Sequence, residues 1–208
     1  MKKVLLSAAA IMCGAVMFAQ SNNSAVNQTG NGNMSDVDQT GMTNVSNVDQ
    51  QGNTNDSDVD QVGVSNNNDT DQNGNDNEAD VLQTGNNNES NIHQGFEASA
   101  SENDNNVASI TQNGNDNFGD LDQYSDIDGY DNNTSTLDQD GDNNYGYNAQ
   151  IGDGNTSDID QLGNSNVGIV HQGEFLGNFS NDNNAASISQ DGDDNTGHID
   201  QYEGAVGS

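Results

Sequence analysis

The chain has 208 residues, of which 34 are acidic and two are basic, and it contains no proline and no tryptophan. Its formal net charge of −32 argues against nucleic-acid binding, which needs a basic footprint, and against docking on anionic lipid. Hydrophobic residues make up 29% of the chain, too few for an ordinary globular core. Composition alone therefore predicts intrinsic disorder, and only the order of the residues can overturn that prediction.

Residues 1–19 have the layout of a secretory signal peptide. Lys2 and Lys3 precede an apolar run that ends at Ala19 and is short for a membrane anchor. We expect cleavage after Ala19, an exported mature chain of residues 20–208 and no membrane span. Cys13 leaves with this leader, so the mature chain has no thiol. A lipidated N-terminus at Cys13 is the alternative, although Met12 before it is larger than the usual small residue.

An 11-residue repeat occupies the rest of the chain. Each of its fifteen units has a Gln, with Asn six residues before it. Ser, Ala or Gly lies four residues before the Gln in fourteen units, and Val, Ile or Leu two residues before it in thirteen. The exceptions are Asn68, Thr70 and Asn148. A disordered chain has no reason to keep this register. The repeat residues are Gln28, Gln39, Gln50, Gln61, Gln72, Gln83, Gln94, Gln112, Gln123, Gln139, Gln150, Gln161, Gln172, Gln190 and Gln201.

The alternation within each unit predicts one β-strand. Asn, the small residue, the aliphatic residue and Gln occupy every second position, so in a strand all four side chains point to one face. A Gly two residues after the Gln, present in eleven units, predicts a tight turn. Two strand-turn units form a 22-residue rung, and rungs stack about 4.8 Å apart. The sequence therefore predicts an all-β fold, a parallel two-sheet β-solenoid of about 15 strands.

The facing strands of this solenoid run in opposite directions, so Asn meets Gln and the small residue meets the aliphatic one across a thin core. Stacked Asn and Gln side chains can hydrogen-bond to their copies in the rungs above and below. Such ladders would offset the missing apolar area. We expect the Gln residues above to form these ladders together with Asn33, Asn44, Asn55, Asn77 and Asn88.

Three insertions interrupt the period, after Gln94, Gln123 and Gln172. All three follow odd-numbered strands, and turns alternate between the two edges of a solenoid. The longer loops, 95–105, 124–132 and 173–183, are therefore expected at one edge. Insertions confined to one face of a repeat protein can mark a binding face, or they can be tolerated loop growth without a ligand.

The outward positions of the strands are rich in carboxylates, such as Asp36, Asp38, Asp58 and Asp60. The first interpretation is a solvated face whose charge keeps sheets from sticking sideways. Recruitment of Ca²⁺ by aligned carboxylates is the alternative. A pattern in the second loop superficially resembles a calcium loop but lacks the later Glu of an EF-hand. Its residues are Asp126, Asp128 and Asp131.

No constellation of residues predicts catalysis. His93, His171 and His198 all lie at outward positions of odd-numbered strands. Only His171 and His198 are on neighbouring rungs, and they differ in position along the strand, so a zinc site is not predicted. The paired Asp residues are copies of the repeat in open solvent, not a cleft that separates two pKa values. The sequence therefore predicts no enzyme, no cofactor and no metal site beyond the weak calcium candidates.

The repeat resembles the curlin repeat, the subunit motif of bacterial curli fibres, over nearly all of residues 22–201. This resemblance implies an extracellular functional amyloid of a Gram-negative bacterium, made through a dedicated outer-membrane route and its nucleation machinery. The motif can be read in two places, at Ser35, Gln39, Gly41, Asn44, Ser46 and Gln50, and again at Asn77, Ala79, Gln83 and Gly85.

Three functions follow as hypotheses. The first is a structural subunit of secreted curli-like fibres that self-assembles into an extracellular biofilm scaffold and adhesin. The second is a monomeric acidic β-solenoid that binds a ligand, ice or cations through a flat face at the cell surface. The third is a disordered, cation-binding acidic matrix protein.

Overall fold

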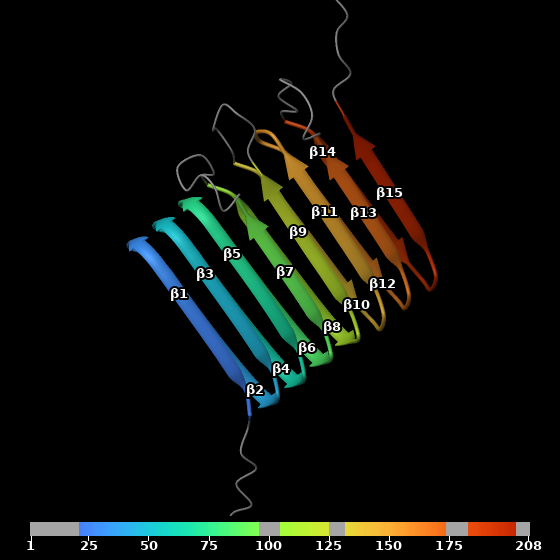
Figure 1. The fold of residues 1–208 in the computed structure, drawn as a ribbon. Coiled ribbons are helices and arrows are strands. Elements are labelled where there is room, and N and C mark those ends of the chain that lie inside the picture. The colour runs from blue at the N-terminus through green and yellow to red at the C-terminus, as the bar shows by residue number, and fades with distance from the viewer. Residues whose placement is uncertain (1–20, 96–104, 125–131, 174–182, 203–208) are drawn as a thin grey trace, which may run out of the picture.

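The computed structural model describes residues 21–95, 105–124, 132–173 and 183–202, and it confirms the predicted two-sheet parallel β-solenoid (Figure 1). We call its two layers the odd sheet and the even sheet. The odd sheet contains β1 (Asn23–Asn31), β3 (Val45–Asn53), β5 (Asn67–Asn75), β7 (Glu89–Gln94), β9 (Phe118–Tyr124), β11 (Tyr145–Ile151), β13 (Val167–Gln172) and β15 (Thr196–Gln201). The even sheet contains β2 (Met34–Met42), β4 (Asp56–Val64), β6 (Glu78–Asn86), β8 (Val107–Asn115), β10 (Thr134–Asp140), β12 (Thr156–Leu162) and β14 (Ala185–Asp191).

The register of the sheets is that of the repeat. Each strand pairs in parallel with the strand two units away, so that Gln50 lies between Gln28 and Gln72. The pairing holds across the insertions, where Gln94 lies beside Gln123. The strands that precede the insertions, β7, β9 and β13, all end at the same edge of the odd sheet (Figure 1). The central residues of the three loops lie outside the described residues.

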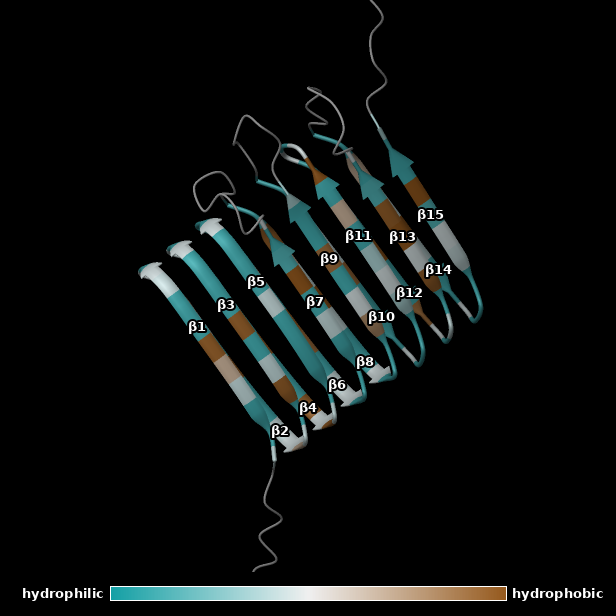
Figure 2. Ribbon diagram, viewed as in Figure 1, coloured by the Kyte–Doolittle hydropathy of each residue, from teal (hydrophilic) through white to brown (hydrophobic). Residues whose placement is uncertain are grey.

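The core between the sheets is more polar than apolar. Among the described residues, 14 hydrophobic side chains are buried, whereas 31 buried residues are polar, and nearly all of these are Asn, Gln or Ser. The hydrophobic residues form narrow bands across strands that are otherwise hydrophilic (Figure 2). Burial of apolar area alone therefore cannot account for the fold, and hydrogen bonds between buried amides must contribute.

Small residues face large ones across this core, as the repeat predicts. A Cβ atom added to Gly146 on β11 would lie 2.4 Å from Cδ1 of Leu137 on β10, so only glycine fits there. The polar exceptions of the repeat are paired with one another. Thr70 Oγ1 donates to Asn68 Oδ1 at 3.2 Å, and the Asn148 carboxamide donates to Ser135 Oγ across the core.

The corners between strands use backbone conformations that the sequence pattern did not predict. The residue directly before each repeat Asn has a positive φ, for example 56° at Thr54 and 57° at Asp116. The repeat Gly also has a positive φ, and its Cα packs against the carbonyl group of the Gly in the next rung. A Cβ atom at Gly85 would lie 1.8 Å from the backbone oxygen of Gly114. The strands also extend further than expected, since six consecutive strands from β1 to β6 have nine residues each.

Two Gly-to-Ala substitutions separate the two reasons for glycine at this repeat position, the positive φ and the close approach to the next rung. In Gly85→Ala the new Cβ atom would clash with the carbonyl of the next rung, and the residue would also be strained by its φ of 124°. In Gly192→Ala the φ of 112° causes the same strain, but the Cβ atom has no neighbour nearer than 3.6 Å. We expect Gly192→Ala to lower the free energy of unfolding by about 1–2 kcal/mol, the cost of a left-handed non-glycine residue. Gly85→Ala should cost several times more, as measured by urea denaturation. Equal losses in the two variants would contradict the stacking argument.

Candidate functional site

The described part of the molecule has no enclosed site with catalytic groups, and its most repeated chemical feature is a ladder of Gln side chains. In the odd sheet, Nε2 of each Gln donates to Oε1 of the Gln in the next rung, from Gln28 to Gln201, at 2.7–3.0 Å. In the even sheet the same ladder runs from Gln39 to Gln190 at 2.7–2.9 Å. All donors point the same way along the solenoid, so each ladder has a direction.

From Gln39 onward, the second N–H of each repeat Gln amide joins the two sheets. Gln83 Nε2 on β6 donates to the backbone oxygen of Asn67 on β5 at 3.0 Å, and Gln94 on β7 donates in the same way to Glu78 on β6 at 2.9 Å. The accepting carbonyl belongs to the residue after the repeat Asn of the facing strand. Both N–H groups and the carbonyl oxygen of a buried Gln are therefore satisfied, as burial of an amide requires.

Most repeat Asn residues bond to the backbone rather than to one another. The expected side-chain ladder is present at three places, where Asn117, Asn184 and Asn195 each donate Nδ2 to Oδ1 of the repeat Asn in the preceding rung at 3.0–3.2 Å. Asn44 Nδ2 donates to backbone oxygens of Thr40 in its own corner and Gly63 in the next rung, each at 3.2 Å. Its Oδ1 accepts the backbone N–H of Asn66 at 3.0 Å. The side chain of Asn is shorter than that of Gln and begins at the corner, so it reaches the backbone first. The carbonyl oxygens of Asn33, Asn55, Asn77 and Asn88 accept in the same way from the next Asn.

The substitution Gln112→Glu tests the Gln ladder. Gln112 Nε2 donates to Gln139 Oε1 and to the backbone oxygen of Glu89, both at 2.9 Å, and its side chain is fully buried. A carboxylate of the same shape has no N–H groups and would leave both acceptors unpaired beside a buried charge. We expect a loss of more than about 3 kcal/mol in the free energy of unfolding at pH 7.

Thr111→Glu is the matched control, because it adds the same charge at the neighbouring position, which is only half-buried. It should cost less than about 1 kcal/mol. Similar losses in the two variants, measured by urea denaturation, would show that added charge matters and the ladder does not.

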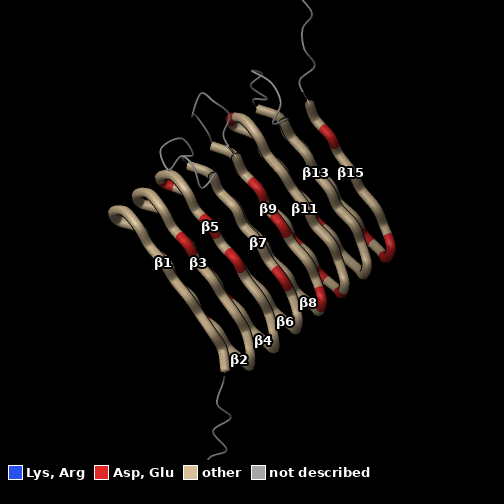
Figure 3. Tube along the Cα trace, in the orientation of Figure 1, with Lys and Arg blue, Asp and Glu red and all other residues tan. Residues whose placement is uncertain are grey.

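Acidic residues occupy matching outward positions on neighbouring strands of the even sheet and form acidic rows there. Figure 3 marks the acidic residues of the chain in red. Asp58 lies between Asp36 and Asp80 on the neighbouring strands of the even sheet. Burial first, and then the surrounding carboxylates, raise the pKa of Asp58. The pKa of Asp138 is raised by the same two causes. Burial and like charges on adjacent rungs both disfavour ionisation, so Asp58 and Asp138 take up a proton more readily than an isolated carboxylate.

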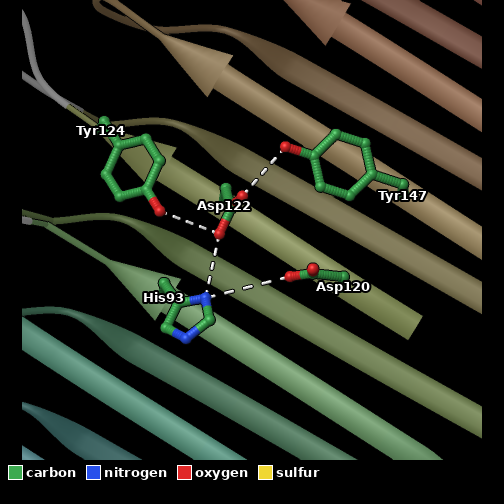
Figure 4. Close-up of polar contacts among 5 residues, drawn as sticks. All are labelled: His93, Asp120, Asp122, Tyr124 and Tyr147. Carbon is green, nitrogen blue, oxygen red and sulfur yellow. Dashed lines mark hydrogen bonds and ion pairs between the residues drawn. The ribbon is translucent and has the colours of Figure 1, made fainter. Parts of the chain in front are cut away.

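A second polar cluster lies on the outward side of the odd sheet and joins β7, β9 and β11 (Figure 4). The Asp122 carboxylate accepts from His93 Nδ1 at 3.0 Å, from the Tyr124 hydroxyl at 3.0 Å and from the Tyr147 hydroxyl at 3.1 Å. Asp120 Oδ1 lies 3.9 Å from His93 Nδ1 and is buried without a hydrogen bond. The sequence signal for this cluster is that His93 and Asp122 occupy the same repeat position two units apart.

This cluster binds protons more tightly than its residue types suggest. Burial, and after it the Asp122 carboxylate, raises the pKa of Asp120 to about 6. The hydrogen bond with Asp122 raises the pKa of His93, and burial opposes that rise. Burial and Asp122 also raise the pKa values of Tyr124 and Tyr147. The cluster can therefore take up a proton between neutral and mildly acidic pH.

The pH dependence of stability follows from these directions. The folded pKa of Asp120 is above its ordinary value, so stability is gained as the pH falls through about 6 towards 4. The raised pKa of His93 gives stability that is present below about pH 6.5 and is lost as the pH rises through the folded value. We expect the chain to be more stable at pH 5 than at pH 8, with Asp120 contributing on the order of 2 kcal/mol.

Asp120→Asn separates this cluster from the general acidity of the chain. It should stabilise the protein at pH 8 and roughly half as much at pH 5, where Asp120 is largely protonated in the folded chain but ionised in the unfolded one, and so flatten the profile of urea midpoint against pH. Asp191→Asn removes one charge from an exposed position of β14 and should leave that slope in place. The account fails if both variants flatten the profile equally.

Several sequence-predicted features lie outside the described residues: the leader and the weak calcium candidates Asp126, Asp128 and Asp131. Across the four described segments, the structure has no helix with the length and apolar character needed to cross a membrane.

The two ends of the solenoid are open in the described part of the chain. β1 and β2 each have a neighbour on one side only, and so do β14 and β15. Gln28 Oε1 and Gln39 Oε1 receive no described donor, whereas Gln190 and Gln201 each use one N–H to the facing strand and keep one. Acceptors therefore face out at the first rung and donors at the last.

A protein-family model matches part of the chain. The family model described as the Curlin associated repeat matches residues 131–163, which contain β10, β11 and most of β12 with Gln139, Gln150 and Gln161. The search of curated proteins finds no significant match.

Proposed function

We propose that the chain is a structural subunit of curli-like fibres, which grow by end-to-end stacking of solenoids outside the cell. The match of residues 131–163 to the Curlin associated repeat supports this proposal. The fibre would serve as an extracellular biofilm scaffold and adhesin. We do not propose an enzymatic role, because the Gln side chains that fill the described core are engaged in structural hydrogen bonds.

The observation that supports this proposal most is the direction of the Gln ladders, which leaves acceptors at one open end and donors at the other. The free N–H of Gln190 at one end matches the open Oε1 of Gln28 at the other, and Gln201 matches Gln39 in the same way. The Asn side chains are complementary in the opposite sense, since Asn195 Oδ1 would accept the backbone N–H of Asn33 of a following subunit. Identical subunits can therefore join head to tail with every amide paired.

The odd number of strands fixes how the subunits would join. The odd sheet has eight strands and the even sheet seven, so the last rung holds β15 alone. A following subunit completes this rung by placing its β1 beside β14 and its β2 beside β15. Each subunit is then rotated by half a turn about the fibre axis. The edges that carry the insertions alternate from one subunit to the next.

We further propose that residues 1–19 direct export and that the mature chain of residues 20–208 reaches the surface of a Gram-negative cell through curli-type secretion and nucleation machinery. The composition of the leader supports export. The acidic rows support solubility before assembly, because a high net charge keeps open sheet edges apart in solution.

The substitution Val26→Pro tests growth at one end. Asn23 N donates to Asn44 O on β3, so the alternate residues of β1, including Val26, direct their N–H groups to the open side. Proline at Val26 removes a donor that an adjoining subunit needs and leaves the described pairing of β1 with β3 in place. Val26→Ala is the matched control, because it shortens the same exposed side chain and keeps the N–H.

We expect Val26→Pro to add to only one end of preformed wild-type fibres and to stop growth there, whereas Val26→Ala grows from both ends. The measurement is elongation of single fibres by fluorescence microscopy, with circular dichroism to verify the β-structure of each variant. Elongation of Val26→Pro at the rate of Val26→Ala at both ends would overturn end-to-end stacking. A purified wild-type chain that stays monomeric or disordered would overturn the fibre function itself.

A further inference from the structure

We infer that His171, His198 and Asp200 form a site for one divalent transition-metal ion on the outward face of the odd sheet. The three residues come from the last two strands of this sheet, β13 and β15. His171 lies beside Asp200 in the register of these strands, and His198 precedes Asp200 by two residues on the same strand, hence on the same face. The parallel pairing thus brings three side chains together at one point.

The distances between the ligand atoms fit a coordination sphere. His171 Nδ1 and His198 Nε2 each lie 2.9 Å from Asp200 Oδ1, and the two nitrogens are 3.4 Å apart. Metal bonds of about 2.0–2.1 Å at angles of 90–110° place neighbouring ligand atoms roughly 2.9–3.4 Å apart. The three atoms can therefore contact one ion without movement of the backbone, provided that each neutral imidazole carries its proton on the ring nitrogen that faces away from Asp200.

The donor set determines the class of ion. Two imidazoles and one carboxylate on one side of an ion suit Zn²⁺, Co²⁺, Ni²⁺ or Cu²⁺, whereas Ca²⁺ and Mg²⁺ prefer oxygen ligands alone. The other coordination positions face solvent, because His198 and Asp200 are exposed. Aromatic groups flank the site: the Tyr147 ring meets the His171 ring edge-on, and the Tyr202 hydroxyl donates to Asp200 at 3.4 Å.

The His93 cluster provides an internal comparison. It too brings a His and two carboxylates together, but it offers one imidazole, and its Asp122 oxygens already accept from two tyrosines. A metal that selects imidazole should therefore prefer the site on β13 and β15. The site requires only the fold of one chain and does not depend on fibre formation.

The test is titration of the purified full chain with Co²⁺, followed by its visible absorption, in a large excess of Ca²⁺ that occupies the general carboxylates. We expect one Co²⁺ per chain, displaced by Zn²⁺. His171→Ala and His198→Ala should each weaken binding at least tenfold, and so should Asp200→Asn, which keeps the shape of the side chain. His93→Ala is the matched control and should bind as the wild type does.

Circular dichroism verifies that each variant is folded. Folding is expected, because these side chains face outward and do not pack in the core. Cobalt binding that is unchanged in the His171→Ala/His198→Ala double variant would overturn the site. Binding that falls equally in His93→Ala, or that disappears in excess Ca²⁺, would overturn it as well, because either result assigns the cation to the general acidic surface. Fibre growth is not used as a readout, so failure here leaves the proposed function untouched.

Discussion

A buried carboxamide must use both of its N–H groups and its carbonyl oxygen, and the rest of the solenoid depends on meeting that requirement. A Gln in an isolated pair of strands could not meet it. In a stack of identical rungs, one N–H reaches the Gln of the next rung and the other reaches a backbone carbonyl of the facing sheet, as Gln83 shows. The chain can therefore fold with 29% hydrophobic residues. The same requirement explains the strict register, since a slip of one residue would turn every amide to the solvent.

The insertions show where this register is tolerant. Between Gln94 and Gln123 the rung gains seven residues, yet the two side chains remain hydrogen-bonded at 3.0 Å. Extra residues are accommodated at the corners, outside the ladders, and all at the edge where the odd strands end. The interior of the solenoid and its ends are therefore constrained by hydrogen bonding. The outward faces are free to vary, and there the acidic rows, the His93 cluster and the residues on β13 and β15 have accumulated.

The sequence predicted the strands, the pairing and the identity of the inward residues, because a period of eleven with internal alternation leaves one way to stack them. It did not predict the positive φ before each Asn, since Thr54 and Ser65 are unusual in that conformation and only the corner geometry imposes it. The side chain of Asn was expected to stack on its copies; it does so at Asn117, Asn184 and Asn195, whereas at most other corners the backbone groups lie closer. The cluster of His93 and Asp122 was missed because the histidines were compared only with one another. Aligning outward positions of neighbouring rungs would have paired His93 with Asp122 and His171 with Asp200.

Hydrogen exchange of the Gln side-chain amides tests the central claim most directly. In the folded chain, NMR of selectively ¹⁵N-labelled Gln should show that the Nε2 protons of the buried residues, such as Gln83 and Gln112, exchange as slowly as the backbone amides of β6 and β8. Those of Gln51, which is exposed and lies outside the ladders, should exchange rapidly. Fast exchange of Gln83 and Gln112 in a chain whose backbone is protected would contradict the account, because the core would then be held by something other than its amide ladders.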